Sequence, residues 1–144
     1  MLCLISLTAI NMFAQKNTIS KPLLFSDFQD NISISASSLE KIFETKTDQF
    51  IQIEFEGGFN AEGQLIHYDT KNNTLQTIGI RLKNFHDIMF SLSRRADANN
   101  QITFIGRIIS HQFEDGYLLK KINEKEYQLT KIQIEKIMPT CSQQ

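Results

Sequence analysis

The chain has 144 residues, the size of one domain, and 41% of them are hydrophobic. Its net charge of −1 gives no global field that would favour nucleic acid or an anionic membrane. With 11 Phe and only two Cys, the chain can build a core from large apolar side chains, without disulfides or metals.

Residues 1–14 are predicted to be a signal peptide. Residues 1–13 form an apolar run that is shorter than the roughly 20 residues needed to cross a bilayer. Ala14 then supplies the small residue typical of a cleavage site. No Lys or Arg precedes the run, which a start codon further upstream would explain; the alternative is a buried N-terminal strand. We therefore expect an exported protein, periplasmic or secreted, whose mature form keeps the single thiol of Cys141.

Residues 15–36 mix polar and apolar side chains without a sustained period, and this predicts an irregular leader. The sequence Ser37-Ser38-Leu39-Glu40 then matches a capping box, in which a Ser side chain and a Glu side chain satisfy each other's backbone N–H groups. Apolar residues follow at helical spacing. The pattern predicts one short helix over residues 38 to about 46, placed to cover the open side of a sheet.

Alternation of apolar and polar residues predicts half-buried antiparallel strands through the rest of the chain. The clearest stretches are residues 50–56, 78–82, 88–94 and 127–134. Gly57-Gly58 supplies the positive φ of a tight turn, residues 95–100 read as a polar hairpin tip, and Pro139 marks the start of a tail over residues 139–144.

Two long hairpins have similar patterns at an offset of 43 residues. The first is predicted to turn at Asn72-Asn73, and the second, over residues 101–122, at Asp115-Gly116. Gly63 and Gly106 fall at equivalent interior positions, where glycine commonly marks a bulge or bend. Bends of this kind allow a sheet to curl. Shared hairpin physics explains the similarity as well as an internal duplication does.

Together these elements predict a mainly β fold in a single domain over residues 37–138. We expect an antiparallel meander of six to eight strands, curled into a small barrel or a two-layer sandwich, with one short N-terminal helix.

No residue pattern indicates catalysis or a cofactor. If the hairpins turn where predicted, His67 lies opposite Ile78 and His111 lies opposite Lys120, but the sequence contains no Cys pair or HExxH motif that would indicate a metal site. No Gly-x-Ser-x-Gly elbow or phosphate loop is present. We therefore expect a protein without a metal or cofactor that is not an enzyme.

The charge is unevenly distributed along the chain. Acids outnumber bases nine to four over residues 16–69, and bases outnumber acids eleven to seven over residues 71–136. A folded domain is expected to mix the two halves. The basic residues of the second half nevertheless suggest a basic face that would attract an anionic glycan or an acidic protein. Its candidate residues are Arg81, Lys83, Arg94, Arg107 and Lys120, with Arg95 and Lys121 nearby.

Two resemblances add to this reading. The spacing Gly58-x4-Gly63-x-Leu65-x3-Asp69-x3-Asn73 is similar to the first signature of Sm-like RNA-binding proteins. This resemblance implies that Asp69 and Asn73 lie in an RNA-facing loop, although the Arg-Gly pair of the second signature is missing.

The chain as a whole resembles the small uncharacterised exported proteins of Bacteroidota-type bacteria, a resemblance that implies no activity. The sequence thus favours an exported, non-catalytic binding domain with a protein or glycan partner. The alternatives are an Sm-like RNA-binding protein in the cytoplasm and a small lipocalin-like carrier, which would use some Phe side chains to line a cavity.

Overall fold

The computed structural model describes residues 20–72 and 74–137 and contains one sheet of eight antiparallel strands. The strands are β1 (Asn31–Ser35), β2 (Phe50–Glu54), β3 (Asn60–Lys71), β4 (Leu75–Leu82), β5 (Ile88–Ala96), β6 (Ile102–Ile109), β7 (Asp115–Lys121) and β8 (Glu126–Gln133). The helices are α1 (Ala36–Phe43), the 3-10 turn η1 (Glu56–Gly58) and α2 (Ile134–Ile137).

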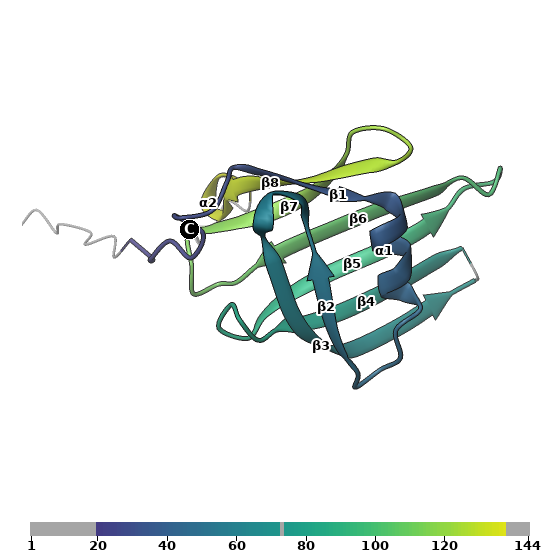
Figure 1. Cartoon of the computed structure of the whole chain (residues 1–144), viewed down its shortest axis with the longest axis horizontal. Helices are drawn as coiled ribbons and strands as arrows, with labels where there is room; N and C mark the ends of the chain where they lie inside the picture. The colour runs from purple at the N-terminus through teal and green to yellow at the C-terminus, as the bar shows by residue number, and fades with distance from the viewer. Residues whose placement is uncertain (1–19, 73, 138–144) are drawn as a thin grey trace, which may run out of the picture.

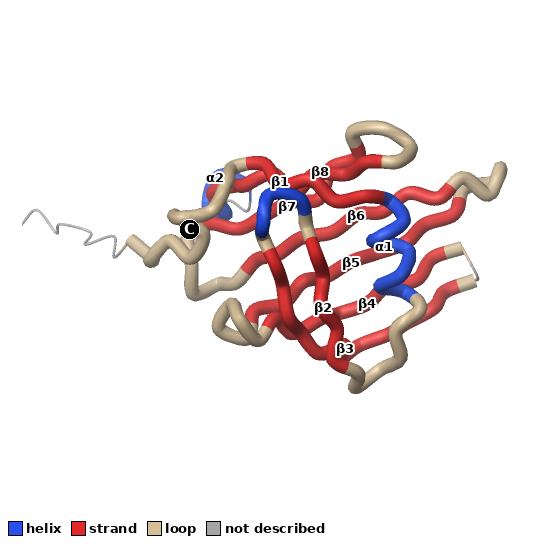
Figure 2. Tube along the Cα trace, viewed as in Figure 1, coloured by secondary structure: helices blue, strands red, loops and turns tan. Residues whose placement is uncertain are grey.

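The strands form a meander whose first strand returns to its last. Their order is β1-β8-β7-β6-β5-β4-β3-β2, so β1 pairs with β8 while β2 to β8 follow the chain. The sheet curls into a half-barrel, and β2 with the first part of β3 lies across β4 to β6 (Figure 1). Helix α1 lies on the same side, beside β2, and strands dominate the trace (Figure 2). The predicted mainly β meander with a short helix near the front is confirmed.

The curl is concentrated in β3. This strand pairs with β2 through residues 60–64 and with β4 through residues 63–71, with an irregular register between Leu65 and His67. Gly63 lies just before this bulge and faces inward, where an added Cβ would lie 2.5 Å from Ile80 Cγ2. The missing side chain and the bulge together let β3 bend from one layer into the other.

The core lies between the two layers. Inward-facing residues of β4 and β5 are fully or almost fully buried, as their alternation predicted, and they pack against Ile53, Phe55 and Leu65 of the β2–β3 hairpin. Helix α1 adds Leu39 and Ile42 to this core.

The segment before β1 packs against the sheet although it has no regular structure. Phe25 is 0% exposed and its ring lies 4.9 Å from the ring of Tyr117, with Phe28, Phe59 and Phe85 around it. The predicted irregular leader therefore contributes Phe25, and in part Leu24, to the core. Residues 31–35, also predicted to be irregular, instead form β1, which pairs with β8.

Helix α1 begins earlier than predicted. Its N-cap is Ser35, whose Oγ accepts a hydrogen bond from the Ser38 backbone N–H at 3.0 Å. Ser37 therefore lies inside the first turn. The predicted partner in the capping box, Glu40, instead faces Arg94 of β5.

The second long hairpin turns earlier than predicted. Tyr117 lies opposite Ile108, so the connection spans residues 110–114, and Asp115 and Gly116 are buried at the start of β7. The Asp-Gly turn signal was wrong because the Asp115 carboxylate binds backbone N–H groups of the leader, a tertiary contact that local turn chemistry does not show. The predicted equivalence of the two turns fails for the same reason.

Three strand ends also differ from the sequence-based boundaries. Strand β2 ends at Glu54 because the chain turns at η1, where Gly57 and Gly58 have φ of 79° and 81°. Strand β5 continues to Ala96, and the predicted last strand gives way to α2 at Ile134. The predicted signal peptide and the tail with Cys141 lie outside the described residues.

Candidate functional site

The outer face of β4 to β7 carries cations without acids. Strands β4, β5 and β6 contain no Asp or Glu, and the single acid of β7, Asp115, is buried. Outward-facing residues alternate with the buried core residues along each strand. Four of them are exposed cations, which together we call the basic face: Arg81, Arg95, Arg107 and Lys120.

The ladder register fixes how these cations are spaced. Arg81 lies opposite Met89, and Arg107 lies opposite Ser91, so two strand spacings and two residues along β5 separate the two arginines. Their Cα atoms are thus roughly 12 Å apart. Lys120 follows Leu119, the partner of Gly106, and therefore lies on the outer side next to Ile105. None of the four cations forms an ion pair with any described residue.

Three basic residues predicted for this surface are placed differently. Arg94 points to the inner side, where its Nε lies 2.8 Å from Glu40 Oε1 and ties β5 to α1. Lys83 lies in the β4–β5 turn with its Nζ 2.9 Å from Asp87, and Lys121 pairs with Glu124 at 2.7 Å. The structure thus places Arg81, Arg107 and Lys120 on one outer side together with Arg95, whereas Arg94 lies on the inner side because neighbouring residues of a strand point to opposite sides.

Between the cations, the basic face carries small polar side chains and one exposed apolar side chain. Its central strand β5 presents Ser91 and Ser93, and Ile105 of β6 is 57% exposed. At one end the surface is hollowed into a pocket of about 410 Å³. The pocket is lined by Lys71, Asn72, Thr74, Leu75, Ser93, Arg95 and Ile105.

A second charged surface covers the β2–β3 hairpin, and we call it the acidic face. Phe50, Gln52 and Glu54 face outward on β2, opposite Gln64, Glu62 and Asn60 of β3. Glu54, Glu56 and Glu62 are exposed, and no Lys or Arg occurs over residues 47–70. Phe50 is the most exposed large apolar side chain of the described residues, at 74%. Because this hairpin lies over β4 to β6, its outer side points away from the basic face (Figure 1).

The exposed acids of the β2–β3 hairpin and the exposed cations of β4 to β7 therefore lie apart, whereas elsewhere the two halves of the chain mix, with Glu40 paired to Arg94 and Asp30 paired to Lys131. Counting charges strand by strand would have revealed this, since three consecutive strands without a single acid are the signal.

The three histidines lie on β3, in the β4–β5 turn and in the β6–β7 connection. His67 lies opposite Gly79 rather than Ile78, because the bulge after Leu65 shifts the register, and it is exposed. His111 lies in the β6–β7 connection and not opposite Lys120, and His86 lies in the β4–β5 turn. Over residues 20–72 and 74–137, no group of three or more His, Cys, Asp or Glu side chains is placed to hold a metal ion.

The residues implied by the Sm-like resemblance are placed as follows. Asp69 lies within β3, paired with Thr77 of β4, and not in a loop. Asn73 lies outside the described residues.

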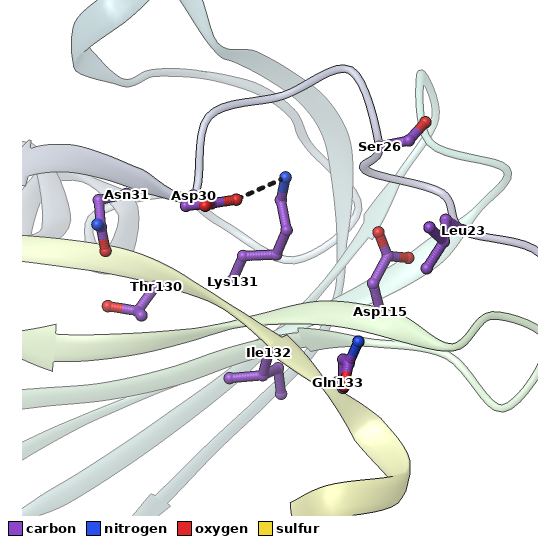
Figure 3. A pocket seen from close by; sticks show the side chains of 9 residues that line it. All are labelled: Leu23, Ser26, Asp30, Asn31, Asp115, Thr130, Lys131, Ile132 and Gln133. Carbon is purple, nitrogen blue, oxygen red and sulfur yellow. Dashed lines mark ion pairs between the residues drawn. The ribbon is translucent and has the colours of Figure 1, made fainter.

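A pocket of about 410 Å³ also lies between the leader and β8 (Figure 3). Its charged groups are engaged within the chain. The Asp115 carboxylate accepts hydrogen bonds from the N–H groups of Leu24 and Phe25, at 2.7 and 2.8 Å. Lys131 Nζ donates to the Phe28 carbonyl at 2.6 Å and lies 3.1 Å from Asp30. This pocket is where the leader is attached to the sheet, so its polar groups already have a structural role.

Tyr117 completes this attachment. Its hydroxyl donates to the Gln29 carbonyl at 2.6 Å. Burial, and after it the nearby carboxylates of Asp115 and Asp30, raises the pKa of Tyr117 to about 12. The hydroxyl is thus held protonated as a donor and is not poised as a general base.

Comparison with known proteins found no family model, no curated protein and no solved structure that matches this chain. Among the described residues, no helix is both long and apolar enough to cross a membrane.

Proposed function

We propose that this chain is an exported, non-catalytic binding domain that recognises an acidic protein through its basic face. The observation that carries the proposal is the absence of acids from β4, β5 and β6 around exposed cations that have no ion-pair partner among the described residues. Unpaired cations gathered on one side create a local positive potential although the net charge is only −1.

A protein partner fits this surface better than a glycan. Aromatic rings are the usual stacking platforms for sugars, and none of the outward-facing residues of β4 to β7 is aromatic. The exposed Ile105 and the half-buried Leu118 instead offer apolar area between Arg107 and Lys120. Apolar side chains ringed by charged ones are typical of protein interfaces.

The packing of the core does not favour a carrier. The rings of Phe25, Phe59, Phe85 and Tyr117 contact one another, with Phe59 and Phe85 stacked at 5.1 Å. They occupy space that a lipocalin-like protein would need for its ligand.

Binding of fluorescently labelled poly-L-glutamate, followed by anisotropy, tests the proposal. Wild type should bind it, and salt should weaken the binding, because exposed charges are screened. Arg81→Glu/Arg107→Glu should lose the binding. Lys125→Glu/Lys136→Glu, which makes the same charge change at exposed residues of the β7–β8 turn and α2, should retain it.

Equal loss in both double variants would show that only net charge matters, and the basic face would then not be a binding site. Stronger binding to a sulfated polysaccharide than to poly-L-glutamate would overturn the choice of a protein partner.

The proposal of export rests on the apolar run of residues 1–13, and a separate experiment tests it. Fractionation and sequencing of the mature N-terminus should give a periplasmic or secreted protein that begins after Ala14. A protein that keeps Met1 in the cytoplasm would contradict export.

A further inference from the structure

We infer that the acidic protein recognised by the basic face is a second copy of this chain, bound through its acidic face. The inference rests on the proposed function of the basic face and adds the identity of the partner. It follows from three features of the outer surface, namely the charges, the apolar anchors and the direction in which the two faces point.

The charges of the two faces are complementary. Glu54, Glu56 and Glu62 stand on a hairpin region without Lys or Arg. The cations stand on strands without exposed acids. Neither set forms an ion pair with a described residue, so both remain available to a partner. Complementary potentials of this kind steer association and set the orientation of the two molecules.

Each face also exposes one large apolar side chain among its charges. Phe50 is 74% exposed on the acidic face, in the same outward-facing set as Glu54 and Glu62. Ile105 is 57% exposed on the basic face, beside Arg107 and Lys120. An apolar contact surrounded by charge pairs is the arrangement from which interfaces take most of their binding energy.

The two faces point to opposite sides of the half-barrel (Figure 1). A contact between them joins two different surfaces and leaves one of each kind free on every pair. Such a heterologous contact continues into chains or rings of copies instead of stopping at a dimer. The four strands of the basic face span roughly 500 Å², which is at the low end for protein interfaces. The association is therefore weak and depends on protein concentration.

Two charge-reversal variants, studied alone and as a mixture, test the inference, and sedimentation velocity measures the average mass of each sample. The acidic-face variant is Glu54→Lys/Glu62→Lys, and the basic-face variant is Arg81→Glu/Arg107→Glu. The wild-type average mass should rise with concentration and fall with added salt. Each variant alone should stay monomeric, because the reversals give the acidic face of one variant a positive charge and cancel the positive charge on the basic face of the other, so that neither variant keeps two complementary faces. An equimolar mixture of the two should associate again, because each variant offers the face that the other needs.

Two further variants separate this contact from general charge effects. Glu124→Lys/Glu135→Lys changes the charge as much as the acidic-face variant does, at exposed residues of the β7–β8 turn and α2, and should associate like wild type. Phe50→Ser keeps every charge and should weaken association by roughly tenfold, as expected for loss of an apolar anchor. Urea unfolding of each variant confirms that it is folded.

A mixture that stays monomeric would overturn the inference, as would wild type that is monomeric at every concentration. If wild type stays monomeric but the basic face still binds poly-L-glutamate, the partner is a different acidic protein and the proposed function stands. If neither occurs, the proposed function fails as well.

Discussion

Single residues in this protein matter most where the inner surface of the sheet is tightly packed. Gly106 is such a position, because a Cβ built on it would meet the neighbouring strand β5, at 3.0 Å from Leu92 Cδ1, 3.1 Å from Phe90 Cε2 and 3.2 Å from the Ser91 carbonyl oxygen. These neighbours are core side chains and backbone, which cannot move away freely. His111, by contrast, is exposed in the β6–β7 connection.

Gly106→Val should therefore destabilise the fold by about 2 kcal/mol or more, through overpacking of the core. His111→Val should change the free energy of unfolding by less than about 0.5 kcal/mol, the usual range for exposed positions. Urea unfolding of the two variants measures both values. Similar values for the two would show that the inner surface around Gly106 is loose.

The contribution of Tyr117 to the stability of the fold depends on pH. Its folded-state pKa is raised to about 12, whereas the usual value is 10.0, so the folded protein keeps the proton longer than the unfolded chain does. The contribution to stability is complete below pH 10 and is lost as the pH rises to 12. Tyr117→Phe lacks the hydroxyl and should be less stable than wild type at neutral pH, because it loses the hydrogen bond to Gln29.

The difference in unfolding free energy between wild type and Tyr117→Phe should narrow above pH 10. Urea unfolding over this pH range measures it, and a constant difference would mean that Tyr117 ionises like a solvent-exposed tyrosine.

At the scale of elements, alternation in the sequence predicted most of the strands and their inner residues. Ile78, Ile80 and Leu82 of β4 are all 0% exposed, and Ile88, Phe90 and Leu92 of β5 are buried as expected. Alternation works here because the side chains of a strand point to opposite faces in turn, whatever the rest of the fold does.

The exceptions arose where distant parts of the chain decide the local structure. Asp115-Gly116 resembled a turn, but Asp115 binds the backbone of residues 24 and 25, about ninety positions away. A bulge after Leu65 moved His67 from its expected partner to Gly79. The parity of β5, with Ile88, Phe90 and Leu92 inward, already places Arg94 on the inner side, and its ion pair with Glu40 lies there.

Helix α1 shows how a local signal can be shifted. Three serines precede its apolar residues, and Ser35, not Ser37, accepts from the Ser38 backbone N–H. The chain enters the helix directly from β1, and the Ala36 backbone N–H donates to the Lys125 carbonyl at 2.8 Å. The end of the strand thus sets the start of the helix.

Ser35→Ala should lower the free energy of unfolding by about 1 kcal/mol, the usual value for loss of an N-cap. Ser37→Ala, which removes an exposed hydroxyl from the first turn, should have less than half of that effect. Thermal unfolding of the pair distinguishes the two positions. A larger loss for Ser37→Ala would place the cap where the sequence pattern had predicted it.

At the scale of the whole molecule, the leader and the last two strands hold each other in place. Residues 22–31 contribute a buried ring, backbone partners for Asp115, Tyr117 and Lys131, and the first residue of β1. The half-barrel thus depends on contacts between its N-terminal and C-terminal parts, even though most neighbouring strands are consecutive in the chain. None of these contacts involves the acidic face of the β2–β3 hairpin or the basic face of β4 to β7.

Phe25 anchors the leader to the sheet, because its ring packs against the rings of Phe59, Phe85 and Tyr117. Phe25→Ala should lower the free energy of unfolding by about 3–5 kcal/mol, because it leaves a cavity among rings that cannot collapse together. Leu23→Ala in the same segment, where Leu23 is 52% exposed, should cost less than about 1 kcal/mol. Urea unfolding compares the two. Nearly equal losses would mean that the leader lies on the sheet without being part of the core, and the space under it would then be open to an apolar ligand.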